Sequence, residues 1–146
     1  MEVMMRYIDR ITRLAYIYRE DYLKDYGLSG MHHTYITTIC RNPGISQEAL
    51  AQKIFVNKSN VARQVAFLEK SGYLTRKASP TDKRKLLLYP TEKAIAVRPV
   101  IAEMLRAWNQ ALLEDFAPEE RAFLSHALEH TMAKAVELTH IKEEKA

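Results

Sequence analysis

Two strong helix caps, Ser46 and Asn57, lie eleven residues apart near the middle of the chain. Each side-chain oxygen can accept a hydrogen bond from a free backbone N–H in the first turn of a helix, so each residue predicts a helix start. Between them, Leu50 and Ile54 are four residues apart and share one helical face. The second helix would end at Gly72, since glycine adopts the left-handed C-terminal conformation without strain. Two short helices joined this closely are typical of a helix-turn-helix.

The second predicted helix has two unlike faces. Val61, Val65 and Leu68 recur at helical spacing and predict the stripe that packs inward. The other face carries mostly polar and basic side chains, namely Ser59, Asn60, Arg63 and Lys70, with Phe67 beside them. Arginine can bond guanine O6 and N7 together, and asparagine can pair bidentately with adenine, so this face suits a DNA major groove. The alternative is a solvated helix face, which is the more common role of any one such surface.

A β-hairpin is predicted directly after this helix. Residues 73–77 and 85–89 each have strand character, and the polar segment 78–84 between them is rich in turn residues. A hairpin in this position is called a wing. Its tip carries Lys83, Arg84 and Lys85, a denser set of cations than packing requires. An arginine at such a tip can enter a narrow minor groove, where the DNA potential is most negative.

Residues 44–94 resemble the MarR family of bacterial and archaeal transcription regulators. The most specific part is the wing, where the segment Asp82-Lys83-Arg84 stands at the family's Asp-x-Arg. The resemblance implies that Arg84 enters the minor groove and that Asp82 helps to hold the wing. It also implies that the recognition helix meets the major groove through Ser59, Ala62 and Arg63. The chain departs from the family pattern at three positions: Phe55 stands where many members have glycine, Phe67 stands at a position that is often basic, and Ala94 replaces a common glycine.

The expected fold is therefore mainly α with a small β-wing. A winged helix-turn-helix part would occupy about residues 31–93, flanked by dimerisation helices at about 1–25 and 94–141. All of it would lie within one domain spanning residues 1–146, a length sufficient for a sizeable core.

Positive charge is concentrated in the same part of the chain. The net charge of the whole chain is +4, but residues 53–93 alone carry +7 and the remainder carries −3. Such a concentration is the electrostatic signature of a nucleic-acid-binding protein. We expect Lys58, Lys70 and Lys83 to contact phosphates of double-stranded DNA.

Helical apolar patterns extend on both sides of this part. Residues 2–25 form one amphipathic pattern, and residues 91–115 and 118–141 form two more, with Pro99 expected to kink or restart the first of these. This is more apolar helix than a compact part of about fifty residues can cover, which predicts a partner surface. The resemblance favours a homodimer, whose two recognition helices would lie about one DNA turn apart, roughly 34 Å. The alternative is that these helices form the core of a monomer.

Several classes of function are disfavoured. No apolar run is long enough to span a membrane, and Met1 to Arg6 lacks the organisation of a signal peptide. The lone Cys40 gives no internal disulfide and fits a reducing cytoplasm; its spacing favours packing over redox sensing. The pair His126 and His130 lacks an evident third metal ligand. No set of nucleophile, base and orienting group is evident, so we expect neither an enzyme nor a metal or cofactor.

The resemblance also implies an effector cleft between the dimerisation helices and the DNA-binding part, often for small aromatic or phenolic molecules. Candidate lining residues are Tyr7, Arg13, Tyr18, Tyr22, His33, Tyr35 and Trp108. An arginine among tyrosines could bind a carboxylate while the rings pack against the apolar part of the ligand. The alternative is that the aromatic residues belong to the core and that Arg13 is a surface residue.

These expectations combine into a sequence-specific, cytoplasmic transcription regulator, a homodimeric repressor on a pseudo-palindromic operator with possible release by an effector. The alternative is a winged-helix module that binds another protein without specific DNA contacts. Charge reversal at Arg84 discriminates between the two, because a protein-docking module need not lose DNA affinity.

Overall fold

The computed structural model describes residues 3–141, so the predicted start of the first helix at Glu2 lies outside the described residues. Most of the chain is helical: α1 (Met4–Leu23), a short 3-10 turn η1 (Lys24–Tyr26), α2 (His32–Arg41), α3 (Gln47–Ile54), α4 (Lys58–Lys70), α5 (Glu92–Leu113) and α6 (Pro118–Thr139). Three strands complete it: β1 (Ile45–Ser46), β2 (Leu74–Ala78) and β3 (Leu86–Pro90). Within the described part of the chain, no helix is long and apolar enough to cross a membrane.

The strands form one antiparallel sheet in the order β1-β3-β2. The hairpin of β2 and β3 is the predicted wing, and its register pairs Arg76 with Leu88. Leu88 also pairs with Ile45 of β1 and is fully buried. The strand β1 was not predicted, because two residues are too short to show a strand pattern. It joins the segment before α3 to the wing and so fixes the wing against the helix-turn-helix.

The core lies where α2, α3, α4, the sheet and the first half of α5 meet. The predicted stripe of α4 is confirmed: Val61, Val65 and Leu68 are each fully buried. They belong to one cluster with side chains from every neighbouring element, including Leu50, Tyr35, Ile39, Leu88, Val97, Ile101 and Met104. Pro99 lies inside α5, which continues through it as a single helix rather than restarting.

The loop between η1 and α2 is attached closely to α1. The Nε of Arg19 donates to the carbonyl oxygen of Gly30 at 2.9 Å, and the carboxylate of Glu20 accepts from the Gly30 N–H. A Cβ atom at Gly30 would lie 2.5 Å from the carbonyl oxygen of Tyr16, closer than real Cβ contacts come. Glycine is therefore required for this approach of the loop to α1.

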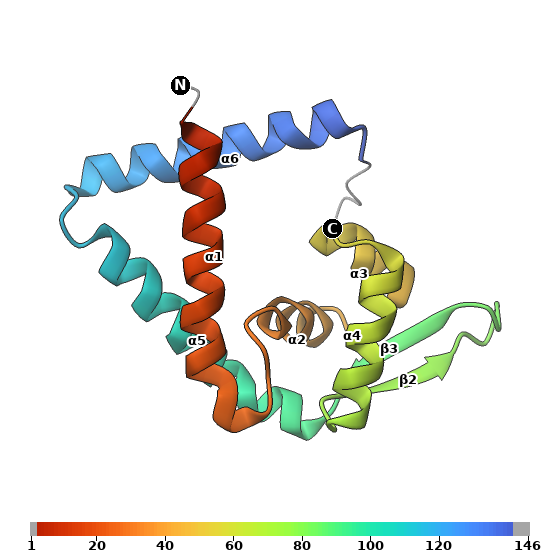
Figure 1. The fold of residues 1–146 in the computed structure, drawn as a ribbon. Coiled ribbons are helices and arrows are strands. Elements are labelled where there is room, and N and C mark those ends of the chain that lie inside the picture. The colour runs from red at the N-terminus through yellow and green to blue at the C-terminus, as the bar shows by residue number, and fades with distance from the viewer. Residues whose placement is uncertain (1–2, 142–146) are drawn as a thin grey trace.

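The helix α6 lies apart from the winged part, across the top of the view in Figure 1. Pro118 occupies its first turn as predicted, and none of its residues is buried. Phe123 and Leu138 are 73% and 78% exposed, and Ile17 of α1 is 63% exposed. Two long helices thus present apolar side chains to solvent in the isolated chain.

Candidate nucleic-acid interface

The helix-turn-helix forms through the two predicted caps. The Ser46 hydroxyl accepts from the Ala49 N–H at 3.0 Å, and the side-chain oxygen of Asn57 accepts from the Asn60 N–H at 2.8 Å. Phe55 ends α3 in the left-handed conformation, with φ of 58°. This is the position where the sequence departs from glycine, and the turn still adopts the conformation that glycine would allow.

The candidate recognition helix is α4, whose outward face carries the expected residues. Lys58, Ser59, Arg63 and Lys70 are exposed, and Asn60 and Ala62 are half-buried. This face lies opposite the fully buried stripe, so a groove could receive it without disturbing the core. Phe67 is 44% exposed and stacks on His32 with ring centroids 5.0 Å apart. The Phe67 ring thus packs against α2, at a position that is often basic in the family.

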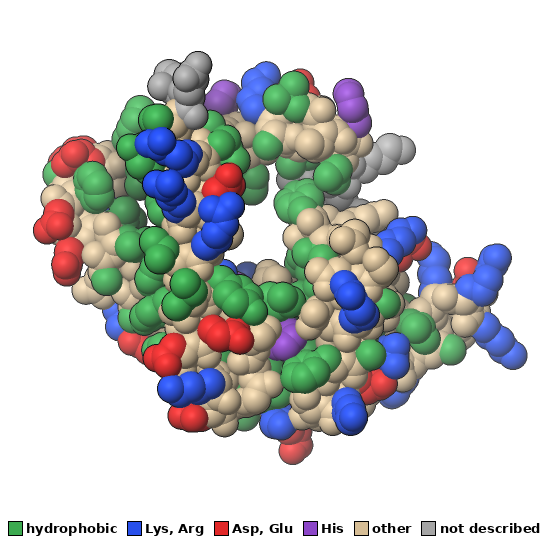
Figure 2. Space-filling model, viewed as in Figure 1, with side chains coloured by type: hydrophobic (Ala, Val, Ile, Leu, Met, Phe, Trp, Pro, Cys, Tyr) green, Lys and Arg blue, Asp and Glu red, His purple; other side chains and the backbone are tan. Residues whose placement is uncertain are grey.

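The wing tip is organised by Asp82. Its carboxylate accepts from the backbone N–H of Arg84 at 3.0 Å and from the Arg84 Nε at 3.3 Å, and its carbonyl oxygen accepts from the Lys85 N–H. The side chain of Arg84 is nevertheless 92% exposed. Figure 2 shows Lys and Arg side chains projecting from the wing at the right of the molecule. The backbone is thus held while the guanidinium stays available.

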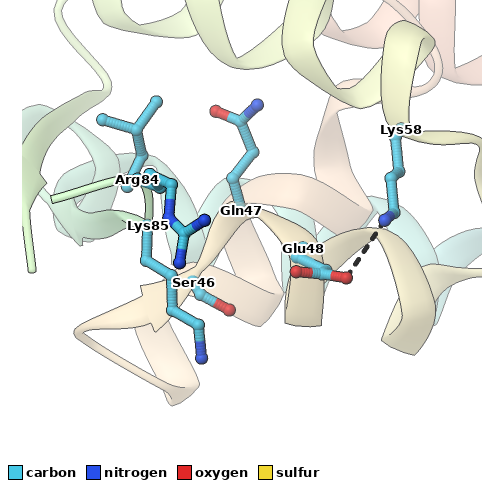
Figure 3. A pocket seen from close by; sticks show the side chains of 7 residues that line it. Ser46, Gln47, Glu48, Lys58, Arg84 and Lys85 are labelled. Atoms are coloured by element: carbon cyan, nitrogen blue, oxygen red, sulfur yellow. Dashed lines mark hydrogen bonds and ion pairs between the residues drawn. The ribbon is translucent and has the colours of Figure 1, made fainter. Parts of the chain in front are cut away.

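A cleft separates the wing from the start of the helix-turn-helix, lined by Ser46, Gln47, Glu48, Lys58, Arg84, Lys85 and Leu86 (Figure 3). Lys58 forms an ion pair with Glu48 across its edge, with Nζ and Oε1 3.0 Å apart. The sequence analysis did not single out Gln47 or Glu48. Their location in the first turn of α3, beside basic residues of the wing, appears only when β1 pairs with β3.

The orientation of the wing relative to α4 is fixed by contacts at its base. Arg76 of β2 forms an ion pair with Glu69 of α4 at 2.9 Å, and this hydrogen bond lowers the pKa of the Glu69 carboxyl. Lys93 donates to the Ser71 carbonyl oxygen at 2.7 Å and lies over the Tyr73 ring. These contacts attach the base of the wing to the C-terminal end of α4.

The expected effector residues lie in separate places. The rings of Tyr18 and Trp108 pack against each other between α1 and α5, tilted by 34° with centroids 4.8 Å apart, and the centroid of the Tyr22 ring lies 5.9 Å from that of Tyr18. Tyr22 also borders a surface depression shared with Tyr26, Pro99 and Glu103, which the sequence analysis did not identify. The other four candidates are spread out: Tyr7 and Arg13 are exposed on α1, Tyr35 is only 1% exposed in the core, and His33 is half-buried on α2.

Other candidate residues have simpler environments. Cys40 is half-buried against the core, and burial raises the pKa of its thiol, which favours packing over reactivity. His126 and His130 are exposed on α6. Among residues 3–141, no three His, Cys, Asp or Glu side chains come together as a metal site.

Comparison with known proteins identifies the family to which this arrangement belongs. A sequence model of the MarR family matches residues 26–85, which contain α2 to the wing tip. The uncharacterised HTH-type transcriptional regulator YybA of Bacillus subtilis is 31% identical over 137 residues, covering 94% of this chain and 91% of YybA. The chain belongs to the MarR family. It is a transcriptional regulator of the MarR type, a class of non-enzymatic DNA-binding proteins.

Solved MarR structures share the fold over nearly the full length. A MarR transcriptional regulator from Methanosarcina mazei superposes with a TM-score of 0.90 at 23% identity, covering 94% of this chain and 99% of that one. A structure from Listeria monocytogenes, described as a MarR family regulator complexed with 26mer DNA, has a TM-score of 0.84 at 26% identity, covering 97% and 98%. The fold of this chain is thus that of MarR regulators, including one solved with DNA.

Proposed function

We propose that this chain is a sequence-specific DNA-binding regulator that acts as a homodimeric repressor on a pseudo-palindromic operator. The observation that carries the proposal is the outward face of α4, with Arg63 exposed, beside a wing whose Arg84 is held at its backbone and free at its guanidinium. In this arrangement Arg63 and its neighbours contact base edges, Arg84 enters the minor groove, and Lys58, Lys70 and Lys83 contact phosphates.

The exposed apolar side chains of α1 and α6 support the homodimer. Solvent exposure of Ile17, Phe123 and Leu138 would be costly in a monomer, and a second copy would cover these helices. A two-fold axis through this interface would place two α4 helices on successive major grooves of one DNA face. Such a protein acts on cytoplasmic DNA, where the free thiol of Cys40 stays reduced.

Titration against the DNA upstream of its own gene, at several salt concentrations, tests the DNA-binding function. We expect binding at physiological salt about a thousandfold tighter than to scrambled DNA. A steep salt dependence without that preference at any genomic site would mean only a basic surface. Failure to bind any DNA would favour the winged-helix protein-interaction module instead.

A small aromatic or phenolic effector would bind near the stack of Tyr18, Tyr22 and Trp108, between α1 and α5. The stack borders the depression at Tyr22, and Trp108 is the only tryptophan of the chain. A ligand regulates only if it favours one separation of the two DNA-binding parts over the other. Titration with salicylate and other aromatic carboxylates, followed by Trp108 fluorescence, should show a saturable change. The same ligand should release operator DNA; fluorescence change without release would contradict an effector role.

A further inference from the structure

A chain of hydrogen bonds runs from the loop before α2 to the recognition helix, and its first link fixes the direction of the rest. His32 is only 3% exposed, and its Nδ1 lies 2.9 Å from the backbone N of Ser29. A backbone N–H can only donate, so Nδ1 must accept and carries no proton. The neutral ring then has its hydrogen on Nε2. Burial of the ring lowers its pKa, which keeps it in this neutral form.

The second link orients Gln64 of α4. The Nε2 of His32 lies 2.8 Å from Gln64 Oε1, and with the proton on Nε2 the histidine donates and the amide oxygen accepts. The amide nitrogen of Gln64 therefore faces the other way. The positions of the oxygen and nitrogen in a side-chain amide are assigned from its hydrogen-bond network. Here the network starts from the backbone N–H of Ser29, which can only donate.

The third link reaches Asn60, in the first turn of the recognition helix. Gln64 Nε2 donates to Asn60 Oδ1 at 3.4 Å, the longest of the three links. The carbonyl oxygen of Asn60 is thus directed along the helix toward Gln64. Its NH2 group has no hydrogen-bond partner within residues 3–141 and remains to be satisfied by something outside the chain.

We propose that His32 and Gln64 determine the base preference of Asn60, so that it selects guanine and disfavours adenine. An asparagine that binds adenine donates to N7 and accepts from the N6 amino group. Here the side-chain oxygen of Asn60 is directed along the helix toward Gln64, and the NH2 group is the part of the amide without a partner. The free NH2 group instead matches the two acceptors of guanine, O6 and N7. This inference rests on the DNA-binding function proposed above and names what one residue of that interface recognises.

Selection of bound duplexes from a random DNA library, with the full-length chain, tests the inference. The unaltered protein should enrich a motif with guanine at one position of each half-site, and Asn60→Ala should lose the preference at that position alone. Gln64→Glu is the decisive variant, because a carboxylate can only accept. Asn60 would then turn its NH2 group toward residue 64 and its oxygen toward the DNA. Preference at the same position should shift by about tenfold from guanine to a base with an amino group, adenine or cytosine.

Two further variants separate this role from a structural one. His32→Phe keeps an aromatic ring against Phe67 but removes the donor, so the preference for guanine over adenine should relax. Gln64→Leu removes the donor to the side-chain oxygen of Asn60 without adding charge. That oxygen can then accept from adenine, so the preference for adenine at this position should increase. Circular dichroism and thermal melting establish that each variant is folded, and preferences at the other motif positions serve as internal controls.

The outcomes distinguish the inference from the function beneath it. If the unaltered chain enriches no sequence, the DNA-binding function fails and the inference fails with it. If a motif is enriched but contains adenine at the Asn60-dependent position, the inference alone is overturned. The same holds if Asn60→Ala leaves the motif unchanged, or if folded Gln64→Glu keeps guanine there.

Discussion

Asp82 and Arg84 have different roles at the wing tip: Asp82 holds the turn, and Arg84 presents an exposed cation. The carboxylate bonds the backbone N–H of Arg84, which holds the turn, while the guanidinium is almost fully exposed. The weak ion pair between them costs little to break at this exposure, so Arg84 can exchange it for DNA.

At Arg84 we expect charge reversal to weaken specific DNA binding by about tenfold to a hundredfold, because a minor-groove contact and a favourable charge are both lost. Affinity for the operator, measured by fluorescence anisotropy, provides the test. Arg84→Lys is the matched variant: it should keep most of the affinity for scrambled DNA and lose part of the preference for the operator. Unchanged operator binding by Arg84→Glu would contradict the assignment of the wing.

The histidines of α2 predict a dependence of stability on pH. Burial, followed by the charge of Arg19, lowers the pKa of His33 to about 4. Burial also lowers the pKa of His32, opposed first by its hydrogen bond to Gln64 and then by the charge of Glu20. Both groups bind protons more readily in the unfolded chain. Their contribution to the free energy of unfolding is therefore fully present above about pH 6.5 and is lost as the pH decreases toward 4. For His33 the loss would approach roughly 3 kcal/mol, at about 1.4 kcal/mol per pH unit.

Urea unfolding at pH 7.5 and 4.5 measures this loss. His33→Gln should reduce the difference in unfolding free energy between the two pH values. The corresponding variant of the exposed His130, His130→Gln, should leave it unchanged. An equal difference in all three proteins would show that groups other than His33 control acid sensitivity.

At the scale of helices and strands, the sequence predicts the features that depend only on residues close together in the chain. The caps Ser46 and Asn57 and the α4 stripe were predicted because each requires residues only three or four positions away. The pairing of His32 with Gln64 joins residues 32 positions apart and leaves no periodic trace. Tyr35 shows the same limit among the effector candidates: the sequence left open whether it lines a cleft or belongs to the core, and only the packing shows that the core covers it.

The exposed face of α6 gives a prediction for the element itself. Leu124 and Leu128 are one turn apart and 38% and 47% exposed. If the proposed homodimer forms through this face, changing both to glutamate should dissociate it, because a charge buried against a partner without a counter-charge is strongly unfavourable. Sedimentation velocity would then detect a single 16.9 kDa chain. The matched control changes His126 and His130 to glutamate, also one turn apart and on another side of the helix, and should remain dimeric. A dimer that persists in the leucine variant would contradict this interface.

At the scale of the whole molecule, positive charge is concentrated in the winged helix-turn-helix. Residues 53–93 carry +7 while the remainder is −3. Eight of the ten lysines and arginines in this segment lie on α4 and the wing, namely Lys58, Arg63, Lys70, Arg76, Lys77, Lys83, Arg84 and Lys85. The electrostatic attraction to DNA therefore acts mainly through α4 and the wing. The acidic balance of the rest opposes binding in other orientations.

Removing a lysine that contacts a phosphate should change the salt dependence of DNA binding by a fixed amount. Lys83→Gln should lower the slope of log affinity against log salt by about 0.9, since one fewer counterion is released from DNA. Lys134→Gln removes the same charge from α6 and should leave the slope unchanged. Binding to scrambled DNA across a salt series measures both. Equal slopes for Lys83→Gln and the unaltered chain would exclude a phosphate contact at Lys83.

Gly30 gives the molecule a point of unusual fragility. The loop approaches α1 so closely that a single methyl group there would meet the carbonyl oxygen of Tyr16. Every change in the first or second base of a glycine codon inserts a side chain or ends the protein. The neighbouring Ser29 begins the hydrogen bonds that reach Asn60. A point mutation at Gly30, 28 positions before the start of α4, would thus displace the loop from which these hydrogen bonds start, and we expect it to alter operator choice.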